Sequence, residues 1–255
     1  MKLLRSFSIL LALALCSTSP LTAQGDNFQM YVVHEDHVKD GMMDKHIEAD
    51  KALLKAAKEH NMEGMEWLAF QADDNRVMYL TEIDNFAELD KNPFKDLQEK
   101  MGEEAFQKLF EPFAETFTKH GDYILNLDKE HSYMPEGMDQ RMEGMNYREL
   151  VFYHIPPGKT DKAVEMAKAA RKLYEDKDSK AYYRLYRSGF GTMDSYFMVA
   201  VSGKDAASVE KMRKENGELL GEEGEKLSSE IQKVFSKREV VTGHVKPEIS
   251  YQAEN

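Results

Sequence analysis

Two histidines stand where apolar, strand-like stretches of the chain end. The stretch YVVH ends at His34, and the stretch VFYH ends at His154. A neutral imidazole can accept a proton as a general base or bind haem iron, so both are candidate catalytic residues if they face a cavity. The ordinary alternative is that each ring caps its strand through a backbone carbonyl. Because both stretches open a similar series of patterns, we expect the two histidines to occupy corresponding positions.

The segment that begins at the first of these histidines, HEDHVKDGMMDKHIEAD, is dense in metal-ligating side chains. Imidazole nitrogens and carboxylate oxygens are ligands for Zn²⁺ and other divalent ions. The spacing matches no fixed metal motif, and the corresponding segment of the second half, HIPPGKTDK, lacks the extra ligands. Acidic residues at the start of a helix are stabilised by the helix dipole, which explains the same residues without a metal ion. We therefore predict no metal site. The side chains that remain as metal candidates are His34, His37, His46 and Asp50.

Aromatic residues gather in the strand-like stretches that follow the first predicted helix of each half. Alternate residues of a strand share a face, so Arg184 and Tyr186 point one way and Tyr183 the other. A wall of aromatic rings with an arginine suits an aromatic ligand that carries a carboxylate or propionate. A core in which the arginine reaches out to solvent explains the pattern equally well. The ligand-binding candidates are Trp67, Phe70, Tyr79, Tyr183, Arg184 and Tyr186.

These residues lie in a sequence that repeats itself. SYMPE at 132–136 and SYQAE at 250–254 are 118 residues apart, and the same offset aligns the apolar stripes of 109–117 and 227–235. Each copy shows the order strand, helix, strand, strand, helix, strand, which is the ferredoxin-like, or split βαβ, order. In the first copy the second helix is expected over 94–117, interrupted at Pro112. The predicted segments are a signal peptide (1–23), a first unit (28–136), a linker (137–146) and a second unit (147–255).

The predicted strands are apolar on both faces. YVVH, ELVFY and YFMVAV carry apolar side chains at odd and even positions, as in a sheet that is buried on both sides. Two helices cover one face of a unit, so the other face must pack on the sheet of the other unit. In element order and burial the chain resembles the dimeric α/β-barrel superfamily. The predicted fold class is α+β, with two tandem ferredoxin-like βαββαβ units whose antiparallel sheets pair into an intramolecular α/β barrel.

The resemblance implies a space for a small, mostly apolar molecule, and the superfamily includes cofactor-independent monooxygenases and haem-binding enzymes. We expect a protein that binds a small apolar or aromatic ligand between its paired sheets, as a monomer that acts as its own pseudo-dimer and can associate further. The first alternative is a haem-handling or cofactor-independent monooxygenase-like enzyme. The second is a non-catalytic interaction module. The sequence requires no cofactor, haem enters only through the resemblance, and no catalytic motif decides whether the protein is an enzyme.

The first 23 residues combine a basic start, an apolar run from Phe7 to Leu15 and small residues before Gln24. This order is typical of a cleaved secretory signal, and the run is too short to span a bilayer. We therefore expect an exported protein, periplasmic or secreted. A lipoprotein anchored through Cys16, the only cysteine, is the alternative.

The chain is acidic, with 46 Asp and Glu against 34 Lys and Arg and a formal net charge of -12. This balance disfavours nucleic acid as a partner. The acidic excess lies in the first unit, where residues 28–134 hold 24 acidic and 12 basic side chains, against 18 and 19 in residues 148–255. An interaction module would therefore use the acidic face of the first unit.

Overall fold

Eight antiparallel strands close into a barrel in a computed structural model that describes residues 27–253. The predicted signal peptide (1–23), with Cys16, lies outside the described residues. The barrel order is β1-β3-β2-β8-β5-β7-β6-β4, so each half contributes four strands. The strands are β1 (Phe28–Val38), β2 (Leu68–Ala72), β3 (Arg76–Ile83), β4 (Phe117–Tyr133), β5 (Tyr147–His154), β6 (Tyr183–Ser188), β7 (Tyr196–Gly203) and β8 (Lys237–Val245).

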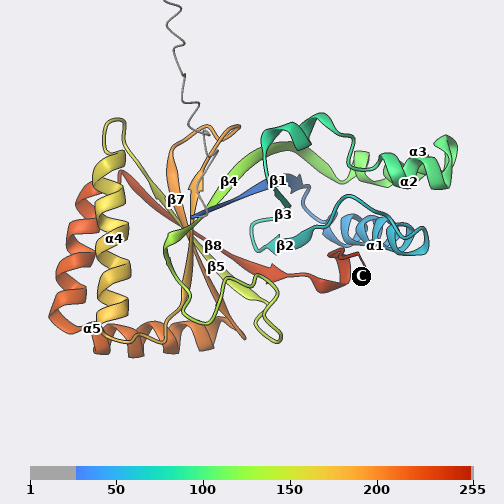
Figure 1. The fold of residues 1–255 in the computed structure, drawn as a ribbon. Helices are drawn as coiled ribbons and strands as arrows, with labels where there is room; N and C mark the ends of the chain where they lie inside the picture. Colours follow the sequence, from blue (N-terminus) through green and yellow to red (C-terminus); the bar gives the residue numbers. More distant parts are fainter. Residues whose placement is uncertain (1–26, 254–255) are drawn as a thin grey trace, which may run out of the picture.

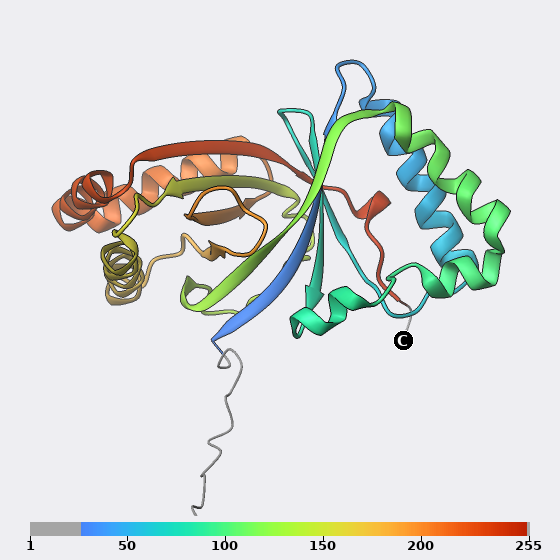
Figure 2. The same ribbon diagram turned by 90° about the horizontal axis from the view of Figure 1, so that it is seen from above.

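The helices lie outside the barrel in two layers, one for each half of the chain. Figure 2 shows these layers on opposite sides of the strands. No described helix has the length and apolar character needed to cross a membrane. The helices are α1 (Met43–Glu59), α2 (Lys95–Met101), α3 (Glu103–Phe110), α4 (Thr160–Asp176) and α5 (Ala206–Val234), with 3-10 turns η1 (Phe86–Asp90), η2 (Glu111–Glu115) and η3 (Pro247–Ile249).

The strands are buried on both faces, as their sequences predict. On β1, Tyr31 and Val33 point into the barrel, whereas Met30 and Val38 belong to clusters on the outer face. The two sheets enclose one apolar cluster, and a separate cluster lies under each helix layer. The expected α+β barrel is therefore present, because strands of this composition need cover on both sides.

The second helix of the first half differs from the expectation of one long element over 94–117. Gly102 has a φ of +83°, a conformation that favours glycine, and it separates α2 from α3. Pro112 then falls in the 3-10 turn η2. The corresponding α5 runs for 29 residues with a kink at Gly221. The helix layer of the first half is therefore made of short pieces.

Tyr133 and Tyr251, the tyrosines of the repeated segments SYMPE and SYQAE, each bond the opposite half of the chain. Tyr133, at the end of β4, donates a hydrogen bond to the carbonyl of Ser179, which follows α4 (3.1 Å). Tyr251 donates to the carbonyl of Met62, which follows α1 (2.6 Å). Both hydroxyls therefore bond a backbone carbonyl across the two halves. Each tyrosine closes the loop after the first helix of the opposite half.

Candidate functional site

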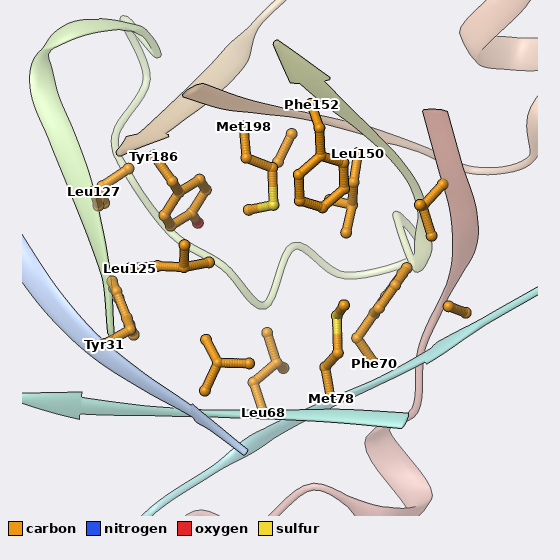
Figure 3. Packing of buried hydrophobic residues seen from close by; sticks show 14 of the residues in the cluster. Tyr31, Leu68, Phe70, Met78, Leu125, Leu127, Leu150, Phe152, Tyr186 and Met198 are labelled. Atoms are coloured by element: carbon orange, nitrogen blue, oxygen red, sulfur yellow. The ribbon is translucent and has the colours of Figure 1, made fainter. Parts of the chain in front are cut away.

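The interior of the barrel is nearly filled by side chains. Figure 3 shows them pointing toward one another from the surrounding strands. The cavity that remains has a volume of about 40 Å³ and is bordered by Phe70, Arg184 and Tyr186 among others. A cavity of this size holds about one water molecule, whereas a ligand pocket measures roughly 300–1,000 Å³. In this conformation the barrel interior is too small for the ligand expected between the sheets.

Two buried arginines at this cavity hold the linker between β4 and β5 rather than a carboxylate. Arg148 donates to the carbonyl of Gln140 (2.8 Å), and Arg184 donates to that of Asp139 (2.9 Å). Burial, followed by the neighbouring Arg184, lowers the pKa of Arg148 to about 10. Gln140 also donates to the hydroxyl of Tyr186 (2.5 Å). These bonds fasten the linker across one end of the barrel, which gives both arginines a structural role.

The other aromatic candidates lie outside the barrel interior. Trp67 packs on Tyr251, with ring centroids 5.1 Å apart, and donates to the carbonyl of Ile249 (2.8 Å). Tyr183 belongs to the core beneath α4 and α5. Tyr79 faces α1, where its hydroxyl meets Asp50. The six predicted ligand-binding residues are therefore divided among the barrel interior and the cores under the two helix layers, and do not form one site.

The two candidate histidines are not equivalent, in contrast to the expectation from their strands. His34 lies opposite Tyr79 and Asp122 on neighbouring strands and faces the helices. His154 is two residues from the inward-facing Phe152 on β5, so it lies on the same face of the strand, beside Tyr196. The strand pairings end at His37 in β1 and at His154 in β5, so these two residues correspond. The similar segments YVVH and VFYH are therefore displaced by three residues from this correspondence. A shift by an odd number of residues moves a side chain to the opposite face of a strand.

Polar and ionisable side chains collect between the sheet of the first half and α1. We call this group the histidine–aspartate cluster. Its central side chains are almost fully buried, with exposed fractions of 0% for His46 and 3% for Asp36 and Asp50. At its rim, the side chain of His120 is 57% exposed. The members are His34 and Asp36 of β1, His46 and Asp50 of α1, Tyr79 of β3, Thr116 before β4, and His120 and Asp122 of β4.

A chain of hydrogen bonds crosses the buried part of the cluster. His46 Nδ1 lies 2.7 Å from Thr116 Oγ1, which itself donates to the carbonyl of Phe113, so Nδ1 carries the proton. His46 Nε2 lies 3.1 Å from the Tyr79 hydroxyl, which in turn lies 2.7 Å from Asp50 Oδ1. When Asp50 is protonated, it can donate to Tyr79, and Tyr79 can donate to His46 Nε2. Along this series of hydrogen bonds each group then donates to the next, and every donor has an acceptor.

The environment displaces the pKa values of these groups in opposite directions. Burial raises the pKa of Asp50 to about 7, against the opposing hydrogen bond from Tyr79. Burial lowers the pKa of His46 and raises that of Tyr79 well above its ordinary value. Burial also disfavours the charged form of His34, but the carboxylates of Asp36 and Asp122 outweigh it and raise its pKa to about 9. Groups with displaced pKa values are common at functional sites.

Five of the corresponding positions in the second half carry apolar side chains. α1 and α4 both have 17 residues, and the offset from Met43 to Thr160 fixes the correspondence of the two halves. The ends of β1 and β5 agree with this offset, and the strand pairings extend the correspondence to β3 and β7 and to β4 and β8. The residues at the positions of His34, Tyr79, Asp122, His46 and Asp50 are Val151, Val199, Val240, Ala163 and Ala167. The fold therefore does not require the cluster.

Sequence reasoning found part of the cluster and missed the rest. It named His34, His46, Asp50 and Tyr79 as candidates, and these come together. His37 does not join them, because it has the opposite parity on β1 and pairs with Glu35 (2.7 Å). The contribution of β4, above all His120, was missed because residues 118–121 follow the predicted helix over 94–117 and carry no strand-like pattern. Pairing of β1 with β4 from Phe117 to Asp128 brings His120 opposite Asp36.

The candidate axial histidines have polar surroundings that do not fit a haem in this conformation. His34 has carboxylates at 2.8 Å (Asp122) and 3.4 Å (Asp36). His154 has them at 3.6 Å (Asp194) and 3.7 Å (Glu239). Neither histidine lines the apolar cavity of the barrel. A porphyrin needs a wide apolar slot beside its axial ligand, so no step is assigned to haem here.

Comparison with solved structures identifies the fold. An anthrone oxidase-like protein matches with a TM-score of 0.57 and 11% identity, over 86% of this chain and 91% of the other. A candidate monooxygenase of Fusobacterium nucleatum matches with a TM-score of 0.53 and 10% identity, over 87% and 94%. The fold is that of the dimeric α/β-barrel superfamily. No family model matches the sequence, and no curated protein does.

A haem-binding protein of Thermus thermophilus matches over 87% of this chain and 92% of the other, at 12% identity and a TM-score of 0.47. Likeness at these levels of identity concerns the fold, and function depends on the site that a fold carries. The activities of these proteins therefore reach this chain only as proposals.

Proposed function

We propose that this chain is an exported protein that binds a small aromatic molecule under the helix layer of its first half and holds it against the histidine–aspartate cluster. The single observation that carries the proposal is the difference between the halves. Five corresponding positions hold histidine, aspartate or tyrosine in the first half and valine or alanine in the second. Buried ionisable groups cost stability, so their presence in one half only points to a function. Export is supported by the basic, apolar and small residues of the first 23 positions.

The surroundings of the cluster suit an aromatic molecule. The ring of Phe113 lies 5.3 Å from that of His46, and Phe117 stacks on His120 at 4.9 Å. Further half-buried rings extend this wall along α2 and α3, namely Phe94, Phe106 and Phe110. Aromatic pairs at these separations are attractive, so the same wall offers stacking to a planar ligand.

The helix layer that covers this wall is loosely anchored. Among the residues of α2, α3 and η2, only Leu97 is fully buried. Segments with few buried apolar side chains open at low cost. A ligand can therefore enter beneath this layer without disturbing the barrel.

The chemistry that the cluster supports is proton transfer at an acidic ligand, as in the monooxygenase-like alternative. A phenol or an activated C–H group beside His120 would meet a base at the rim and a chain of hydrogen bonds behind it. Such a ligand loses a proton and becomes an anion, which the histidines stabilise. Oxidation of that anion would require O₂ as a separate reactant.

Fluorescence titration with 2-naphthol, a small aromatic acid, tests this proposal. We expect saturable binding that is weakened at least 10-fold by His120→Ala and retained in His37→Ala, the matched histidine of the opposite parity. Tyr186→Phe, in the barrel interior, is expected to bind as the wild type does. The proposal is wrong if no saturable binding occurs, or if Tyr186→Phe and not His120→Ala removes it. Added haemin is expected to give no Soret shift that depends on His34 or His154.

A further inference from the structure

We propose that His34, Asp36 and His120 bind one divalent transition-metal ion. One ligand atom from each of these side chains lies within 4.8 Å of the others. His34 Nε2 is 3.4 Å from Asp36 Oδ1, and His120 Nδ1 is 4.0 Å from the same oxygen. Ligands that are about 2.0–2.2 Å from a shared ion have separations close to these, so small side-chain rotations complete the site.

The carboxylate of Asp36 supports this inference independently. Its side chain is 4% exposed, and Oδ1 receives no hydrogen bond of good geometry from the described residues. His34 Nε2 approaches the same oxygen at 3.4 Å, outside good hydrogen-bond geometry. A buried carboxylate oxygen without a donor is costly. A cation between Asp36 and the two histidines satisfies it.

The opposite edge of the His34 ring is already held as metal-ligating histidines usually are. His34 Nδ1 lies 2.8 Å from Asp122 Oδ1. A hydrogen bond from Nδ1–H to this carboxylate leaves the Nε2 lone pair directed at the proposed ion and makes it a better ligand. Asp36, the carboxylate ligand, also contacts the rest of the cluster, because its Oδ2 lies 3.5 Å from His46 Nε2.

The register of the strands brings the ligands together. Pairing of β1 with β4 places His34 opposite Asp122, and Asp36 opposite His120. The exposed side of His120 leaves room for entry of an ion and for further ligands. Two imidazoles and one carboxylate suit Zn²⁺, Fe²⁺ or Co²⁺ and not Ca²⁺ or Mg²⁺, which prefer oxygen ligands.

The second half provides an internal comparison. Its residues at the positions of the three ligands are Val151, Tyr153 and Arg238, which cannot form such a site. The inference shares its location with the proposed function and deepens it, because an ion here would meet the ligand of the cluster directly. It also revises the expectation of no metal site, since that expectation was based on spacing along the chain.

Calorimetric titration of the tag-free protein with Zn²⁺, repeated with Co²⁺ by visible absorption, tests the inference. We expect one ion per chain and a loss of affinity of at least 10-fold in His34→Ala and His120→Ala. Asp122→Asn is expected to weaken binding by about 10-fold, as for other partners of metal-ligating histidines. His37→Ala and His154→Ala are the matched controls and should bind as the wild type does. His120 is exposed, so its variant is expected to fold, which circular dichroism checks.

The inference is overturned if the wild type shows no saturable binding of Zn²⁺ or Co²⁺, or if His120→Ala binds both ions unchanged. Its failure can be told from that of the proposed function. Binding of Zn²⁺ without any binding of 2-naphthol would refute only the proposed function. Binding of 2-naphthol by protein that takes up neither ion would refute only the metal site.

Discussion

At the scale of single residues, the buried carboxyl of Asp50 illustrates what the cluster costs. It faces Tyr79 and His46, and the charges of Asp36 and His34 also act on it. Because burial raises its pKa to about 7, the folded protein holds a proton on Asp50 at pH values where the unfolded chain has lost it. Between about pH 4 and the raised pKa, this group therefore lowers the free energy of unfolding as the pH rises.

Asp50→Asn should remove this dependence. In metal-free protein at about pH 8, we expect the variant to be more stable than the wild type by roughly 4 kcal/mol, with the advantage shrinking toward pH 4. Asparagine keeps an oxygen for the Tyr79 hydroxyl and carries no charge. Urea unfolding at several pH values measures the difference. A difference that stays constant across this pH range would show that Asp50 ionises normally in the folded protein.

The sequence showed which residues could form the site more readily than it showed the strand face on which each side chain lies. The density of His34, His46 and Asp50 was evident, and these residues do meet. The face on which His154 and His37 lie was not evident, because a shift of three residues between repeats reverses the side of a strand. His120 was missed because its neighbours, at positions 118, 119 and 121, give it no strand-like pattern.

At the scale of elements, Tyr133 and Tyr251 each bond the opposite half of the chain, and we expect their hydroxyls to contribute equally to the free energy of unfolding. Removal of the Tyr251 hydroxyl leaves the buried carbonyl of Met62 without its donor, and removal of the Tyr133 hydroxyl does the same to Ser179. Tyr251→Phe and Tyr133→Phe should each lower the free energy of unfolding, measured in urea, by about 1 kcal/mol. Tyr182→Phe, which loses only an exposed bond to Glu136, is the control. A loss confined to the control would contradict the assigned role of these bonds.

The helix layers of the two halves should differ in mobility. α2 and α3 contribute one fully buried side chain, whereas α4 alone contributes Ala163, Met166, Ala167 and Leu173. We therefore expect amide hydrogens of α2 and α3 to exchange at least 10-fold faster than those of α4. Mass spectrometry of deuterium uptake measures this. Equal protection of the two layers would rule out entry of a ligand beneath the first.

The sequence indicated most elements correctly because their patterns are local. Strands such as β1 and β7 are marked by apolar residues of both parities, and α1 and α4 by helical spacing. The break at Gly102 was not expected, since one glycine in a helical pattern is often tolerated. Its positive φ is a property of the packed structure.

At the scale of the whole molecule, the barrel exists only when both halves are present. The pairs β2–β8 and β4–β6 join the halves, and the inward side chains of one sheet are covered by the other. The burial of both strand faces predicted this pairing. The filling of the interior could not be predicted, because it depends on side-chain volumes in three dimensions and on the path of the linker.

The first half alone, residues 28–136, should therefore fail to form a stable monomer. It would expose the inner sheet face with Tyr31, Val33 and Leu68, and it would lack the Tyr251 bond. We expect this fragment to elute as a dimer or larger species in size-exclusion chromatography with light scattering. A monomeric fragment with cooperative unfolding would show that the sheets do not depend on each other.

The most direct test of the central claim locates the ligand in the whole protein. The chain has 8 histidines distributed over both halves, so selective ¹³C labelling of histidine gives a set of reporters. On titration with 2-naphthol we predict shifts of the imidazole signals of His34, His46 and His120, with those of His154 and His244 unchanged. Shifts confined to His154 or His244 would place the ligand in the barrel or the second half and would contradict the assignment of function to the histidine–aspartate cluster.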